Sequence, residues 1–209
     1  MTVVQALLAF SVAAALLTIT PGLDTAIVLR TAAVEGSKRA ALAAAGVIAG
    51  CLVWGAAVAL GLGVLLQAST LAFNVIKWAG CAYLVWLGIG LILKPRDSFQ
   101  LSAPAGPAGT SDFAWMRRGF LTNLLNPKVG VFYISFLPQF LPQGVAPGPF
   151  IFLLAALHGV MGLAWFAVLI GATRPLQGLL QRSAVVRWLD RLTGGVFLAF
   201  GVRLALERR

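Results

Sequence analysis

Two short polar stretches, each built around a proline, interrupt long apolar runs of this chain. The first is Thr20-Pro21-Gly22-Leu23-Asp24, and the second is Asn123-Leu124-Leu125-Asn126-Pro127-Lys128. Proline lacks the amide proton and clashes with the preceding turn, so each stretch should break a helix. The glycine after the first proline loosens the backbone further. Paired breaks in corresponding positions of a membrane carrier are a pointer to its binding site.

The groups at the two breaks fit a zwitterionic substrate. Half-helix N-termini carry partial positive charge and suit a carboxylate, whereas freed carbonyls suit an ammonium group. Free amino acids carry both groups. The alternative is that the prolines only shape the helices, that the asparagines cap freed backbone, and that the lysine forms a structural ion pair. The predicted substrate-binding residues are Thr20, Pro21, Gly22, Asn123, Asn126, Pro127 and Lys128.

Asp24 and His158 are the candidates for proton coupling. An acid at membrane depth is expensive and calls for a reason, and a poorly solvated carboxyl can exchange protons near neutral pH. His158 is the single histidine and lies within an apolar run, where it could relay protons. The structural alternatives are a buried partner for Asp24 and a backbone carbonyl for His158. Lys77 and Tyr83 are secondary candidates, although Lys77 could also snorkel to the surface.

The composition places these residues in a membrane protein. The chain has 209 residues, 60% hydrophobic and 11% charged, with mean hydropathy +0.93, whereas a soluble domain carries about 25% charged residues. The apolar runs are too long for strands, which predicts an all-α integral membrane protein. The first basic residue is Arg30, so no signal peptide is expected. The net charge of +10 lies mainly in short loops, where membrane orientation explains it without a nucleic-acid partner.

Six transmembrane helices are expected, the first and fourth of them broken at the prolines. Without a break, the first run of 32 residues would span roughly 48 Å as one helix, which exceeds a hydrocarbon core of about 30 Å. Gly46 and Gly50 give the second helix a small face for close packing. Residues 94–114 should form a flexible loop, and residues 174–188 a basic connector in the membrane interface. The predicted spans are about 3–34, 40–66, 71–93, 119–141, 149–172 and 189–206.

The loop charges predict the orientation of these spans. One side receives 11 Lys and Arg residues, whereas the connecting loops of the other side have none. The basic side should be cytoplasmic, with both termini in the periplasm.

The chain also repeats itself. Pro21 and Pro127 are 106 residues apart, and the third and sixth predicted spans share a pattern at an offset of 114 residues. Three spans in each half is an odd number, so the two halves insert with opposite orientation. The sequence therefore predicts a single transporter domain built as an inverted 3+3 repeat, with residues 1–93 and 115–209 as its halves.

The two proline motifs resemble those of the LysE/RhtB family of amino-acid exporters. The stretch Lys77-Trp78-Ala79-Gly80, with Tyr83-Leu84 and Trp86-Leu87-Gly88, also resembles the family. The resemblance implies a bacterial inner-membrane carrier that exports amino acids, driven by proton entry. It is nearest to the RhtB-type branch, whose substrates include homoserine, threonine and leucine. One departure is Leu23, where many relatives have a second proline.

We therefore expect an amino-acid/proton antiporter that works by alternating access, that is not an enzyme and that has no cofactor. Its partners would be the amino acid, protons, the bilayer and, in one arrangement, a second copy in a homodimer. A metal-ion exporter is one alternative, but it needs several intramembrane acids, and Asp24 is the only acid predicted well inside a span. A thiol-disulfide carrier that uses Cys51 and Cys81 is another alternative, but neither cysteine has a neighbouring proline or base. Both cysteines are predicted to be small buried hydrophobic residues.

Overall fold

The computed structural model describes residues 1–20, 22–68, 78, 81–82, 85–86, 88–95, 111–172 and 182–206. For residues 62–68, 127, 193, 196, 200, 203 and 204 it describes the backbone alone. Every regular element in the described part of the chain is helical, as predicted. These elements are α1 (Val3–Ile19), α2 (Leu23–Val34), α3 (Ser37–Ala68), α5 (Asp112–Leu124), α6 (Pro127–Phe136), the 3-10 helix η1 (Leu137–Phe140), α7 (Pro147–Gly171) and α9 (Ser183–Leu206).

Two of the described helices are long and apolar enough to cross a membrane. They are the Ser37–Gly61 part of α3 and the whole of α7, and the bent pair α1 and α2 would be a third span. The predicted third span, residues 71–93, lies largely outside the described residues. The six-span inverted repeat therefore stays a prediction, while the long apolar helices are confirmed.

The first predicted break separates α1 from α2. Thr20 ends α1 in an extended conformation (φ −67°, ψ 120°), as expected before a proline, whose ring disfavours the helical region for the preceding residue. Its hydroxyl donates to the Leu16 carbonyl at 2.7 Å. Gly22 then begins α2, also extended and without a side-chain cap. The two helices meet at 52°.

The second predicted break separates α5 from α6. Asn126 is extended (φ −80°, ψ 107°), and its Oδ1 accepts a hydrogen bond from the Lys128 amide at 3.1 Å. Pro127 is the first residue of α6, a position where its missing amide proton costs nothing. The first half of this broken helix begins at Asp112, not after residues 117–118 as predicted, because Ser111 caps it by accepting from the Ala114 amide.

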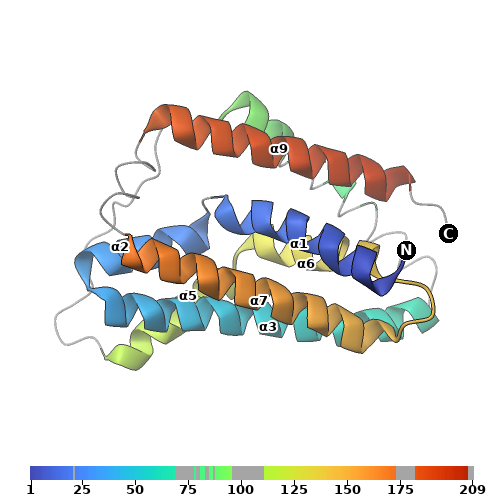
Figure 1. Cartoon of the computed structure of the whole chain (residues 1–209), viewed down its shortest axis with the longest axis horizontal. Coiled ribbons are helices and arrows are strands. Elements are labelled where there is room, and N and C mark those ends of the chain that lie inside the picture. Colours follow the sequence, from blue (N-terminus) through green and yellow to red (C-terminus); the bar gives the residue numbers. More distant parts are fainter. Residues whose placement is uncertain are drawn as a thin grey trace.

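α5 and α7 pack along α3, which is the longest of the described helices (Figure 1). A Cβ added to Gly46 would collide with the Met116 carbonyl, and one added to Gly119 would collide with the Ala43 carbonyl. α3 and α5 therefore approach backbone to backbone, which confirms the predicted packing role of Gly46. An aromatic cluster fills the core around α1, α6 and η1. The ring centroids of Phe132 and Phe136 are 4.5 Å apart, and those of Phe10 and Phe140 are 5.5 Å apart.

α9 corrects two predictions. It begins at Ser183, so residues 183–188, predicted as part of an interfacial connector, belong to the helix itself. Asp190, predicted to lie near a helix end, is the eighth residue of α9 and is fully buried. It lies four residues after Val186, which packs against Leu29 of α2. One face of α9 thus turns inward, so Asp24 is not the only acid that lies well inside a helix.

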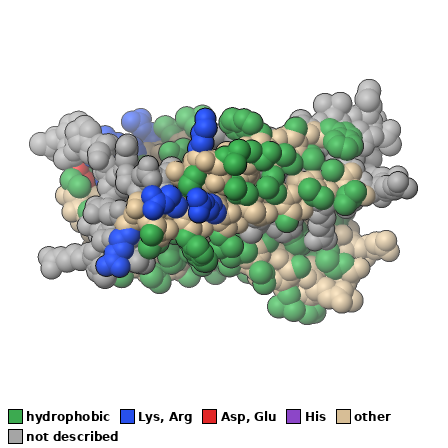
Figure 2. Space-filling model, turned by 90° about the horizontal axis from the view of Figure 1, so that it is seen from above, with side chains coloured by type: hydrophobic (Ala, Val, Ile, Leu, Met, Phe, Trp, Pro, Cys, Tyr) green, Lys and Arg blue, Asp and Glu red, His purple; other side chains and the backbone are tan. Residues whose placement is uncertain are grey.

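Basic side chains gather toward one end of the molecule. Figure 2 shows Lys and Arg over the half where α2 runs into α3, and none among the described side chains at the other end of this face. At the basic end Lys38 pairs with Asp112 at 2.6 Å. Lys38 holds the pKa of that carboxyl below its usual value, first by the hydrogen bond and then by its charge. α1 begins and α9 ends at the opposite end (Figure 1).

Candidate functional site

The two breaks meet in space. The Asn123 side-chain amide, in the last turn of α5, donates to Asp24 Oδ2 in the first turn of α2 at 2.8 Å. The two residues are 99 positions apart in the chain, and Asn123 is fully buried. The predicted structural alternative for Asp24, a buried amide partner, is therefore present. It accounts for one of the two carboxylate oxygens.

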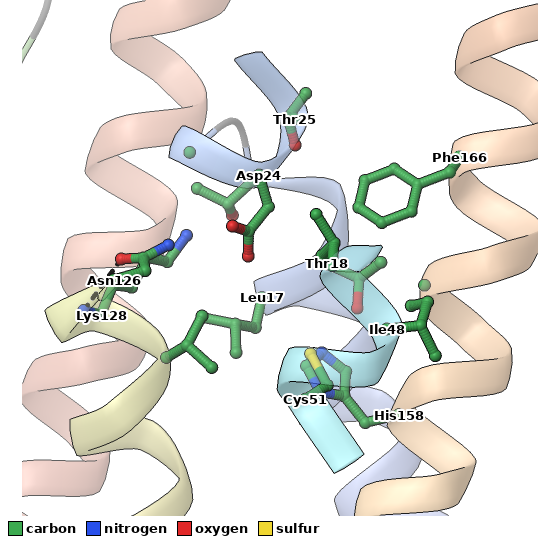
Figure 3. Close-up of a pocket in the computed structure, with 15 residues that line it drawn as sticks. Leu17, Thr18, Asp24, Thr25, Ile48, Cys51, Asn126, Lys128, His158 and Phe166 are labelled. Atoms are coloured by element: carbon green, nitrogen blue, oxygen red, sulfur yellow. Dashed lines mark hydrogen bonds between the residues drawn. The ribbon is translucent and has the colours of Figure 1, made fainter. Parts of the chain in front are cut away.

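The other oxygen, Asp24 Oδ1, is buried and has no donor in hydrogen-bonding geometry in the described part of the chain. The side chains of Asn126 and Lys128 from the second break lie beside this carboxylate (Figure 3). The Lys128 ammonium lies beside Gly22, where an added Cβ would be 3.6 Å from Nζ. A buried carboxylate oxygen without a donor costs on the order of 1–3 kcal/mol or more. A proton or an ammonium group at this position would remove that cost.

A cavity of about 60 Å³ lies between the two breaks, α3 and α7. One water needs about 10–15 Å³, so the cavity has room for roughly four to six waters. Figure 3 shows Asp24 between Asn126 and Lys128 on one side and Ile48 and Phe166 on the other. Predicted site residues that line it are Thr20, Gly22, Asp24, Asn126, Lys128 and His158.

His158 lines the same cavity from α7. Its Nδ1 and the Tyr133 hydroxyl of α6 are 2.9 Å apart, and both side chains are buried. The predicted structural partner, a backbone carbonyl, is thus replaced by a phenol. Because Tyr133 engages Nδ1, Nε2 is the ring nitrogen that remains for a ligand. Tyr133 itself was not predicted, although a tyrosine inside a span needs a partner for its hydroxyl, and that need is the signal that points to it.

α3 contributes two residues whose place in the site was not predicted. Gly50 lies against Asn123, and a Cβ there would be 2.6 Å from the Asn123 Oδ1. Cys51 is buried as predicted, but it also lines the cavity and accepts a hydrogen bond from the Asn123 side-chain amide at 3.3 Å. Gly50 therefore makes room for the amide that holds Asp24. The small residues at positions 46, 50 and 51 were the sequence feature that could have indicated a close approach of α5 to α3 here.

Three predicted residues cannot be placed at the site. Pro21, Lys77 and Tyr83 lie outside the described residues, and Pro127 is described by its backbone alone. Thr20 lines the cavity, although its hydroxyl is engaged with its own helix.

The acids and cysteines in the described part of the chain bear on the two alternative chemistries. Among the described residues, no group of three or more His, Cys, Asp or Glu side chains is placed to hold a metal ion. Cys51 contacts Asn123 of α5, whereas Cys81 donates to the Gly201 carbonyl of α9 at 3.0 Å. Both cysteines are free thiols. They thus have separate partners.

Relatives of the chain are bacterial membrane and efflux proteins. A leucine efflux protein of Klebsiella pneumoniae subsp. pneumoniae is 33% identical over 203 residues, 95% of this chain and 93% of the relative. A threonine efflux protein of Escherichia coli K12 is 29% identical over 196 residues, 90% of this chain and 91% of the relative. An uncharacterized membrane protein of Bacillus subtilis is 27% identical over 210 residues, 97% of this chain and all of the relative. No solved structure matches the chain.

The match to a protein family covers most of the chain and is not confined to the two breaks. Residues 15–208 match the family described as LysE type translocator, which confirms the resemblance that the proline motifs carried. Translocators are not enzymes, and the apolar helices agree with a bacterial membrane protein. This chain belongs to the LysE type translocator family.

Proposed function

We propose that the chain is a secondary active exporter of neutral amino acids across the bacterial inner membrane, with the cavity between the two breaks as its substrate site. The observation that carries this proposal is the convergence of Asp24, Asn126 and Lys128, which come from different breaks, on one cavity. The names of the relatives, leucine efflux protein and threonine efflux protein, support amino acids as the substrate class.

Each end of a zwitterion finds a complementary group. The substrate ammonium binds at Asp24 Oδ1, the buried oxygen that has no donor among the described residues. The substrate carboxylate binds near the Lys128 ammonium and the first turn of α2. The amides of that turn have no side-chain cap, because the N-cap residue is Gly22, and such amides favour an anion.

Proton antiport follows from two ligands that compete for one oxygen. A proton on Asp24 and an ammonium group beside it satisfy the same position, so Asp24 holds one or the other. In alternating access, the two halves rock around the site, and inward movement of a proton drives outward movement of an amino acid. His158 exchanges protons at the other side of the cavity. The basic end, which carries Lys38, faces the cytoplasm, and the termini then face the periplasm.

Counterflow in proteoliposomes tests this proposal. Vesicles that contain the purified protein are loaded with one unlabelled amino acid from a panel and receive trace labelled leucine, threonine or homoserine outside, with and without an imposed pH gradient. We expect uptake that depends on the loaded amino acid and on the gradient. Folded protein that exchanges no amino acid would overturn the proposal. Exchange that ignores the gradient would overturn the proton antiport while leaving the substrate site.

A further inference from the structure

The cavity has two unlike ends. Asp24, Asn126 and Lys128 lie at one end, contributed by α2 and the α5–α6 break, whereas Ile48 of α3 and Phe166 of α7 lie at the other (Figure 3). Val47 and Gly162 add to the apolar end, and none of the described lining residues there carries a formal charge. An amino acid bound by its ammonium and carboxylate at the polar end must direct its side chain toward the apolar end.

The wall at the apolar end is formed by Ile48 against a glycine of α7. A Cβ added to Gly162 would lie 3.0 Å from the Ile48 Cδ1, closer than ordinary van der Waals contact. Any larger residue at position 162 must therefore displace the tip of Ile48. Phe166 lies one helical turn further along α7, on the same face, and is buried in a cluster that also contains Val47.

Few polar groups at this end can recognise a side-chain hydroxyl. The Thr18 hydroxyl, which also lines the cavity, already donates to the Ala14 carbonyl of its own helix at 2.7 Å. Thr25, which Figure 3 shows near Phe166, and His158 are further polar groups that line the cavity. A charged side chain would be buried among Val47, Ile48 and Phe166 without a counter-ion from the described residues that line this end of the cavity, which is strongly unfavourable.

We propose that Ile48, Gly162 and Phe166 form the subsite for the substrate side chain, and that this subsite selects uncharged aliphatic side chains by size. This inference rests on the proposed function, because it takes the cavity as the amino-acid site. One methylene more or less in an apolar pocket changes selection by roughly 10- to 200-fold. Small changes at the wall should therefore alter which amino acid is exchanged.

The test compares leucine with alanine as the loaded amino acid in counterflow. Gly162→Ala narrows the subsite, so we expect its leucine-to-alanine ratio to fall by about tenfold. Ile48→Ala widens the subsite, so the ratio should rise and methionine or phenylalanine should become exchangeable. The matched control is Gly171→Ala, also in α7, whose added Cβ would meet no described atom within 4 Å at a position that does not line the cavity. The control should leave the ratio unchanged.

The outcomes separate this inference from the proposed function. An unchanged ratio in both Gly162→Ala and Ile48→Ala, with alanine still exchanged, overturns the subsite and leaves the exporter. A shift of equal size in Gly171→Ala also overturns it, because a change in α7 away from the cavity would then be sufficient. If Gly162→Ala does not fold, Ile48→Ala alone decides between the two results. Failure of the wild-type protein to exchange any amino acid overturns the proposed function itself.

Discussion

Each of the two breaks contains a proline, but the helices that follow them, α2 and α6, begin differently. Asn126 caps α6 with its own side chain, which accepts from the Lys128 amide at 3.1 Å. Gly22 leaves the start of α2 without a side-chain cap. The second break is therefore closed on itself and supplies side chains, whereas the first leaves backbone amides and a carboxylate oxygen for a ligand. Similar sequence motifs thus produce two unlike halves of one site.

The largest effect should come from the acid of the first break. Asp24→Asn keeps the shape but removes the charge that faces the substrate ammonium. Loss of one partner of a buried charge pair costs about 2–5 kcal/mol, so counterflow should fall at least about 30-fold. Asp112→Asn is the matched control, because that acid lies at the surface in a pair with Lys38, and it should exchange at nearly the wild-type rate. Full exchange by Asp24→Asn would remove Asp24 from the site.

The cation of the second break should have the next largest effect. Lys128→Met keeps most of the side-chain stem and removes the ammonium. A hydrogen bond to a charged group is worth about 1.5–3 kcal/mol, so the KM for the amino acid should rise about tenfold or more. The control is Lys38→Met, which removes an exposed ammonium that pairs with Asp112 and does not line the cavity. An unchanged KM in Lys128→Met would mean that this lysine is a structural partner of Asp24 only.

A cap added to the first break should make it resemble the second. Gly22→Ser supplies a hydroxyl that can accept from the first-turn amides of α2, so the stability should stay the same or rise by a few tenths of a kcal/mol, while exchange falls several-fold because the carboxylate site is occupied. Gly22→Ala controls for size, since its Cβ fits 3.6 Å from the Lys128 Nζ. Removing the existing cap with Asn126→Ala should instead cost about 1 kcal/mol. Thermal unfolding in detergent and counterflow measure the two effects. Equal changes in stability in Gly22→Ser and Asn126→Ala would contradict the conclusion that only the second break has a side-chain cap.

The smallest effect should come from the contact through which α6 positions His158. Tyr133→Phe removes one hydrogen bond, worth about 1 kcal/mol, and we expect a two- to five-fold slower exchange with the fold retained. A second variant, His158→Gln, tells whether Tyr133 acts through the imidazole. If it does, adding Tyr133→Phe to His158→Gln has little further effect. Independent effects that add would assign Tyr133 to packing alone.

The sequence was sufficient to predict the breaks but not what surrounds them. Proline and glycine act locally, so the ends of α1 and α5 followed from Pro21 and Pro127. The neighbours of the site depend on how each helix is rotated, and a helix such as α7 is apolar on all sides, so periodicity does not say which side faces inward. The contact of Gly50 with Asn123 and that of Tyr133 with His158 therefore required the structure.

α9 shows the opposite difficulty. Its first turns carry arginines and a tryptophan, which favoured an interfacial connector. The inward face that contains Val186 and Asp190 is short. Arginines lie on other faces of the same turns, so the segment as a whole has the composition of a basic connector. The start of α9 at Ser183 was therefore missed, although polar residues spaced around an apolar stripe are typical of a helix at the end of a span.

The most direct test of a single site between the two breaks uses Cys51, which lines the cavity beside Asn123. In the Cys81→Ser protein, the rate at which N-ethylmaleimide labels Cys51 is measured with and without a saturating amino acid that the protein exchanges. We predict that the amino acid slows labelling several-fold, and that it has no such effect in Asp24→Asn. Labelling at the same rate with and without that amino acid would contradict a substrate site between the breaks.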